Sequence, residues 1–143
     1  TYTSTPGDRF GTLLRRIFLA TLTIELLGAL ALFSVELERL PLAQAAWYAT
    51  FHSISAFCNA GMSLRIDNFI GFRDHFLVIS TLSVLIVTGG LGFTVLSELF
   101  SHVGKRLRKR QPTVLTLHTK LSLSMTALLL VFGMLVYIFL EYW

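Results

Sequence analysis

The sequence has little charge for its length, and this deficit limits the class of protein more than any motif does. Asp, Glu, Lys and Arg make up 14% of the 143 residues, and hydrophobic residues make up 54%. A soluble domain usually carries about 25% charged residues. The composition therefore predicts a membrane protein rather than a soluble domain.

Cysteine is nearly absent as well. The single residue Cys58 excludes an internal disulfide and a cysteine metal cluster. No nucleophile–base pair and no zinc-type ligand spacing stands out, so we expect no enzyme activity and no bound cofactor. The glycine-rich stretch at 88–93 lacks the Lys-Ser/Thr of a phosphate loop. Its small residues favour close packing of one helix on another, with a hinge as the alternative.

The basic residues that are present gather between apolar segments. The formal net charge is +4, and the densest run is Lys105, Arg106, Arg108, Lys109 and Arg110. Between apolar spans, such a run is typical of a cytoplasmic loop rather than of a nucleic-acid site. We therefore predict a cytoplasmic loop at 104–112 that contacts membrane lipids or a cytosolic partner, and no nucleic-acid partner.

Three apolar segments have the length of a transmembrane helix. They cover residues 17–36, 76–100 and 120–140, each near the ~20 residues that cross a bilayer. Basic residues precede the first and third segments, which places both of these ends in the cytoplasm. The N-terminus is then cytoplasmic, and residue 143 lies outside. Because the chain begins with Thr rather than Met, we also expect it to be part of a longer polypeptide.

A fourth uncharged stretch, residues 40–64, must begin and end on the outer side. Residues 43–57 favour a helix of only about 22 Å, too short to cross. Residues 58–63 are poor helix formers and contain Gly61. Non-helical backbone at this depth is tolerated only inside protein or around a water-filled cavity. The predicted fold is an all-α membrane protein, with a helix, a re-entrant pore helix and filter, a second helix, and one further transmembrane helix.

A re-entrant loop of this kind binds a cation through its backbone. Carbonyl oxygens replace the water shell of the ion. We predict cation ligands at the carbonyls of Cys58, Asn59, Ala60 and Gly61, supported by Met62 and Ser63. A buried turn at Gly61 without an ion is the alternative. The Asn59 amide is predicted to brace the filter from behind.

Polar side chains within the apolar segments are further candidates. Ser53 and Ser55 are predicted to bond the i−4 carbonyl or a neighbouring helix. His52 is predicted to be a satisfied polar contact rather than a proton sensor. Glu25 is the one charged residue at mid-membrane depth. It is a candidate intramembrane polar site, and two interpretations stay open for it: a cation ligand, or a carboxyl that is protonated or paired within the bundle.

Three motifs in this chain resemble the Trk/Ktr potassium-transporter superfamily. They are His-Ser-Ile-Ser-Ala-Phe-Cys-Asn-Ala-Gly-Met-Ser at 52–63, Gly-Gly-Leu-Gly-Phe-Thr-Val-Leu-Ser-Glu-Leu at 89–99, and Leu-Thr-Leu-His-Thr-Lys-Leu at 115–121. Met62 stands where the family often has Phe. Proteins of this family have four M1–pore–M2 repeats around one pore. The resemblance implies that this chain holds the second repeat and M1 of the third.

What the resemblance implies for function is potassium uptake across the bacterial inner membrane, with this chain forming one quarter of the filter. It also implies a homodimer, the remaining repeats of the same polypeptide as partners, and a cytosolic nucleotide-binding regulatory subunit. Two alternatives stay open. One is a small cation channel that tetramerises around one loop per chain, and the other is a non-conducting membrane adaptor.

Overall fold

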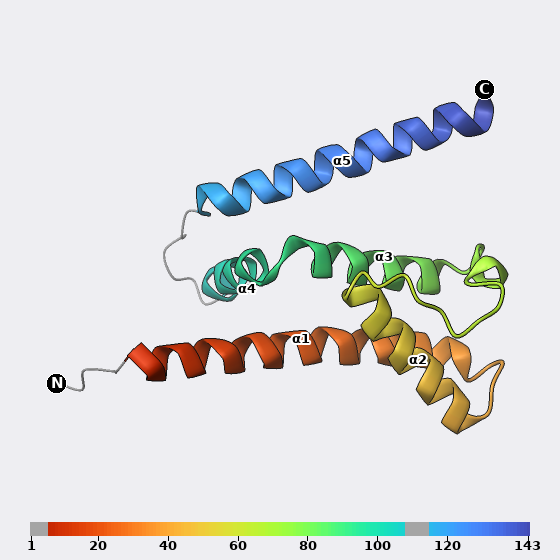
Figure 1. The fold of residues 1–143 in the computed structure, drawn as a ribbon, viewed down its shortest axis with the longest axis horizontal. Coiled ribbons are helices and arrows are strands. Elements are labelled where there is room, and N and C mark those ends of the chain that lie inside the picture. The colour runs from red at the N-terminus through yellow and green to blue at the C-terminus, as the bar shows by residue number, and fades with distance from the viewer. Residues whose placement is uncertain (1–5, 108–114) are drawn as a thin grey trace. The chain divides into compact units, whose positions relative to one another are not determined.

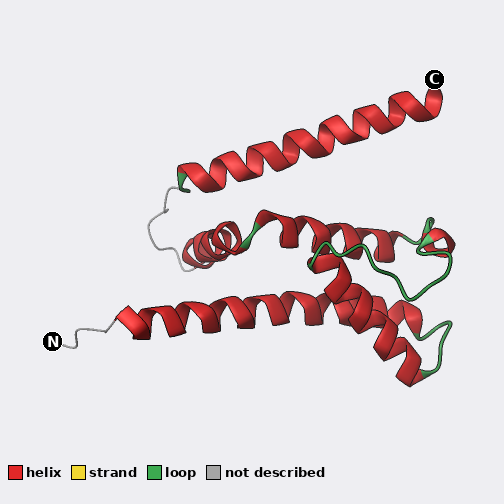
Figure 2. Cartoon of the chain, in the orientation of Figure 1, coloured by secondary structure: helices red, strands yellow, loops and turns green. Residues whose placement is uncertain are grey.

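The computed structural model describes residues 6–107 and 115–143, with side chains over 11–102 and 115–143. Over these residues the chain is helical and has no strand (Figure 2). The α-helices are α1 (Pro6–Glu36), α2 (Leu42–Phe57), α3 (Phe76–Leu91), α4 (Phe93–Leu107) and α5 (Leu117–Tyr142), with a short 3-10 helix η1 (Ile70–Phe72) before α3 (Figure 1). The predicted all-α class is confirmed. Residues up to Gly90 form one compact unit, and those from Leu91 form a second.

Length and apolarity separate the helices into two groups. Of the helices described, Gly11–Glu36 and Leu117–Tyr142 are each long and apolar enough to cross a membrane. The segments Phe76–Leu91 and Phe93–His102 meet that criterion only as a pair. Helix α2 has 16 residues, about 24 Å, which is less than the ~30 Å hydrocarbon core. The chain is therefore a membrane protein with two or three candidate spans.

Small residues let α2 lie close against α1 in the first unit (Figure 1). Ala45, Ala49 and Ser53 recur every four residues along one face of α2, and all three are buried. The Ser53 hydroxyl donates a 2.7 Å hydrogen bond to the backbone carbonyl of Glu25 on α1. A Cβ at Gly28 would lie 2.7 Å from the Ser53 oxygen. Close approach of backbones is how helices associate where lipid is as apolar as protein.

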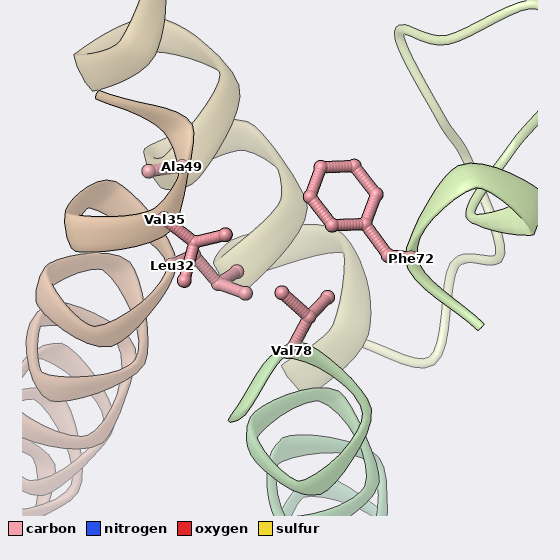
Figure 3. Packing of buried hydrophobic residues seen from close by; sticks show 5 residues of the cluster. All are labelled: Leu32, Val35, Ala49, Phe72 and Val78. Carbon is pink, nitrogen blue, oxygen red and sulfur yellow. The ribbon is translucent and has the colours of Figure 1, made fainter. Parts of the chain in front are cut away.

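An apolar cluster joins four elements near the C-terminal end of α1. Its buried members are Leu32 and Val35 of α1, Ala49 of α2, Phe72 of η1 and Val78 of α3 (Figure 3). The cluster therefore fixes the loop that follows α2 between the start of α3 and the end of α1.

The glycine-rich stretch at 88–93 has two distinct roles. At Gly89 a Cβ would lie 1.8 Å from the Phe57 carbonyl oxygen, so α3 touches the backbone at the end of α2. This confirms the predicted close packing. Gly92, with φ of +78°, separates α3 from α4. The predicted single helix over 76–100 is therefore wrong, because the chain breaks at a glycine that takes a left-handed conformation.

The second unit joins α4 to α5 through one carboxylate. Glu98 of α4 accepts hydrogen bonds from the Thr116 amide, at 2.6 Å, and from the Thr116 hydroxyl, at 2.8 Å. It also accepts from the Thr119 hydroxyl. Thr116 is itself the N-cap residue of α5. An acceptor with negative charge suits a helix N-terminus, where the first amides lack partners.

The observed helix ends differ from the predicted ones in particular places. Helix α2 begins one residue earlier than predicted, and Pro41 is its N-cap residue. Helix α1 begins at Pro6 and so extends beyond the predicted transmembrane segment at 17–36, with which it shares its last residue. Of the predicted cytoplasmic loop at 104–112, residues 104–107 belong to α4, and residues 108–112 lie outside the described residues.

Two adjacent glycines of α3 test the packing of α2 on α3. We expect Gly89→Ala to lower stability by about 1–3 kcal/mol or more, because the new methyl group overlaps backbone. The control is Gly90→Ala, where the nearest atom, the Asn59 amide nitrogen, would lie 3.9 Å away. Alanine there should be neutral or stabilise by about 0.5–1 kcal/mol. Melting temperatures of the purified protein in detergent measure both, and equal shifts would contradict the close contact.

Candidate functional site

The C-terminus of α2 ends in a well-defined capping motif. With Cys58 as the C-cap residue, the Asn59 amide bonds the Ala56 carbonyl at 3.1 Å, and the Ala60 amide bonds the Ser55 carbonyl at 2.9 Å. This pattern is the Schellman motif, which needs a left-handed residue directly after the cap. Asn59 supplies it with φ of +54°, and Asn tolerates this conformation better than most residues.

Beyond the cap, residues 58–64 turn back along α2, and we call them the return segment. The Ser55 hydroxyl holds the first part of it. Its oxygen donates to the Met62 carbonyl at 2.8 Å and accepts from the Met62 amide at 3.1 Å. The predicted partner of Ser55, the i−4 carbonyl or a neighbouring helix, is therefore wrong. The hydroxyl bonds Met62 instead, because both backbone groups of Met62 lie within its reach.

His52, one turn earlier on α2, holds the next part of the return segment. Its Nε2 accepts from the Leu64 amide at 3.2 Å and lies 3.2 Å from the Ser63 hydroxyl. Since Nε2 is an acceptor, the ring is neutral and carries its proton on Nδ1. The ring is 2% exposed and meets Phe69 edge-on at 4.8 Å. Nε2 thus makes the predicted polar contact, but the buried Nδ1 has no hydrogen bond of normal geometry within the described residues, so only part of the ring is satisfied.

Arg65 follows the return segment and contacts α2 at Tyr48, one turn before His52. Its guanidinium lies over Tyr48 of α2 at 5.3 Å and over Phe72 at 4.7 Å. It also forms an ion pair with Glu36, whose side chain is 5% exposed. Ser55, His52 and Tyr48 therefore contact successively later residues of the chain. In the sequence these three polar residues are four and three positions apart, a spacing that puts their side chains on one face of a helix.

The direction of the backbone carbonyls follows from these bonds. The peptide bonds of the return segment are trans, and a trans peptide points its N–H and C=O in opposite directions. The amides of Asn59, Ala60 and Met62 all point to atoms of α2. The carbonyls of the preceding residues, Cys58, Asn59 and Gly61, must therefore point away from those atoms.

The outer side of the return segment is open over the described residues. Each residue from 58 to 62 is exposed, and Met62 is 59% exposed. Gly61 has φ of +66°, and a Cβ built there would meet no atom within 4 Å. On the inner side, a cavity of about 250 Å³ lies among α2, the return segment and α3. The predicted ligands Cys58, Asn59, Ala60 and Gly61 are thus all exposed, whereas Ser63 is half-buried.

Two other predicted site residues also have defined positions. The Asn59 amide nitrogen lies 3.4 Å from the carbonyls of Phe57 and Ile86, so it faces α3, in agreement with the predicted brace. Glu25 is half-buried in α1, and its side chain has no ion-pair partner within the described residues. Its backbone carbonyl accepts from Ser53. Both interpretations of its carboxyl stay predictions.

Comparison with known sequences places this chain in a family. The sequence model of TrkH, described as a cation transport protein, matches residues 9–143. This chain belongs to the TrkH family. The chain is 37% identical to the potassium/sodium uptake protein NtpJ of Enterococcus hirae over 82% of its own length and 25% of the relative's. It is 35% identical to the Ktr system potassium uptake protein B of Bacillus subtilis, over 91% of this chain and 28% of the relative.

A third relative, the Ktr system potassium uptake protein B of Vibrio alginolyticus, is 43% identical over 66% of this chain and 20% of its own length. The chain thus spans about a quarter of the curated relatives that it matches. The resemblance to the Trk/Ktr superfamily drawn from three motifs is confirmed, and the TrkH match extends well beyond those motifs.

The Arg65–Glu36 ion pair of this TrkH-family chain can be compared with a second, exposed ion pair, Arg73–Asp74. We expect Glu36→Gln to lower stability by about 1–3 kcal/mol, because it leaves the Arg65 guanidinium, 22% exposed, without its countercharge. The Arg73–Asp74 pair is 80% and 90% exposed, so Asp74→Asn should cost less than about 1 kcal/mol. Melting temperatures in detergent measure the difference. Equal stability of the two variants would show that the buried pair does not hold the loop.

Proposed function

We propose that this chain is part of a potassium uptake protein and supplies one quarter of its selectivity filter. In this proposal α1 is M1, α2 is the pore helix, residues 58–63 are the filter, α3 with α4 is M2, and α5 is M1 of the next repeat. The carbonyls of Cys58, Asn59, Ala60 and Gly61 bind the ion. The names of the relatives and the quarter-length match support this assignment.

The observation that carries the proposal is the separation of donors from acceptors in the return segment. The amides of Asn59, Ala60 and Met62 all donate hydrogen bonds to atoms of α2. The carbonyls that precede them point away from α2 on an open face, where a dehydrated cation needs oxygen ligands. Helix α2 ends at the same place, and its C-terminus adds a partial negative charge that favours a cation. K⁺ would move through this site down its electrochemical gradient.

One such segment surrounds only part of an ion. The remaining ligands would come from the other repeats of the same polypeptide, which fits a chain that spans about a quarter of its relatives. The wider assembly follows the family resemblance. We propose a homodimer in the bacterial inner membrane with a cytoplasmic N-terminus and a cytosolic nucleotide-binding regulatory subunit.

Gly61 gives the direct test of the filter. In the full-length protein that contains these residues, Gly61→Ser should reduce K⁺ over Na⁺ discrimination. Space is open there, but φ of +66° costs a residue with a side chain about 1–2 kcal/mol. The backbone should therefore leave this conformation and misplace the carbonyls. The measurement is rubidium-tracer uptake into proteoliposomes, with K⁺ or Na⁺ as competitor.

The control for this test is Gly133→Ser in α5. Gly133 also has no atom within 4 Å of a built Cβ, but its φ lies outside the left-handed region. We expect unchanged discrimination there. If Gly61→Ser also left the discrimination unchanged in folded protein, the filter assignment would be wrong.

A further inference from the structure

We infer that Ser55 and His52 are positioning residues that set K⁺ over Na⁺ discrimination by fixing two peptide planes of the return segment. The inference rests on the proposed function, because it assigns a cause to the selectivity of that filter. Neither side chain touches the ion. Each acts through a hydrogen bond to a backbone amide, which directs the carbonyl of the same peptide, that of Gly61 or of Ser63, away from α2.

Ser55 acts on the peptide between Gly61 and Met62. Glycine has the widest backbone freedom of any residue, so this peptide is the one most able to rotate. The Ser55 oxygen accepts from the Met62 amide and donates to the Met62 carbonyl, which uses both functions of one hydroxyl. Rotation of the Gly61 carbonyl would require the first of these bonds to break.

His52 acts in the same way on the peptide between Ser63 and Leu64. Its Nε2 accepts from the Leu64 amide, which directs the Ser63 carbonyl away from α2. The ring has little freedom, since Tyr48, Phe51 and Phe69 meet it edge-on at 4.8–5.8 Å. A rigid acceptor of this kind fixes the return segment at its far end, as Ser55 fixes it near Gly61.

Selectivity depends on such restraint. K⁺ and Na⁺ carry the same charge and differ in size, so a filter separates them by the number and placement of its carbonyl oxygens. A peptide that rotates freely no longer holds its oxygen at one distance. Loss of a restraint should therefore lower discrimination and leave ion entry intact.

Ser53 offers a matched control on the same helix. Its hydroxyl is also buried and also bonds a backbone carbonyl, but that carbonyl belongs to Glu25 on α1. Ser53→Ala and Ser55→Ala remove the same atom from residues two apart in α2, on different faces of the helix. Only Ser55→Ala frees the return segment.

The experiment measures rubidium-tracer uptake by full-length protein in proteoliposomes, with K⁺ and Na⁺ as competitors. Gly61→Ser, Ser55→Ala, Ser55→Thr and Ser53→Ala are compared with the native protein. We expect Ser55→Ala to lower the ratio of half-inhibiting Na⁺ to half-inhibiting K⁺ by roughly tenfold, which corresponds to about 1.4 kcal/mol, within the cost of unsatisfied buried polar groups. Ser55→Thr keeps the hydroxyl and should keep the ratio. Ser53→Ala should lower only the melting temperature.

The outcomes separate this inference from the filter proposal. A lowered ratio in Gly61→Ser with a native ratio in Ser55→Ala would overturn the positioning role and leave the filter in place. Native ratios in both variants would overturn the filter, and the inference with it. An equal loss of the ratio in Ser53→Ala and Ser55→Ala would show that the hydroxyls act only through helix packing, which also overturns the inference.

His52 supplies a second pair of variants if Ser55→Ala does not fold. A Gln side chain places its amide near the position of Nε2, and an Asn side chain places its amide near Nδ1. Because Nε2 is the atom that accepts from Leu64, His52→Gln should keep the ratio and His52→Asn should lower it. Equal ratios in the two variants would overturn the role of His52.

Discussion

Every peptide group that leaves a helix at membrane depth needs a hydrogen-bond partner, and this constraint organises the first unit. Helix α2 provides partners for five amides of the segment that follows it. Its terminal carbonyls bind the amides of Cys58, Asn59 and Ala60, and its side chains bind those of Met62 and Leu64. A short helix thereby acts as the hydrogen-bonding template for the segment that follows it. The remaining packing serves mainly to hold that template in place.

Close contacts with two other helices provide this support. On one side, Gly28 and Ser53 bring α2 against the backbone of α1. On another side, Gly89 brings α3 against the carbonyl of Phe57, at the residue where α2 ends. In lipid, burial of apolar surface contributes little to helix association. Close packing and hydrogen bonds therefore decide the geometry. The position of the return segment therefore depends on glycines that lie far from it in sequence.

The sequence predicted the elements well and their contacts less well. Charge sidedness and length placed the short helix at 43–57, within one residue of α2. A hinge within 88–93 was only the alternative interpretation, because Gly89 and Gly92 look alike in sequence, and only the fold shows that Gly89 packs and Gly92 breaks the helix. The role of Ser55 was also missed, since a hydroxyl in a helix can bond its own i−4 carbonyl. Its actual partner depends on the path of a loop in space.

The conformation of the return segment explains why its carbonyls gather on one face. In an extended strand successive carbonyls point to alternate sides. Here Asn59 and Gly61 take positive φ within three residues, and the amides of Asn59, Ala60 and Met62 all turn toward α2. Acceptors are thus set apart from donors over a stretch too short for any regular element. A buried row of unpaired carbonyls is costly unless water or a cation meets it. In the proposed filter, such a row would be stable at membrane depth because it lies beside an ion path, and this would account for the unusual backbone of the return segment.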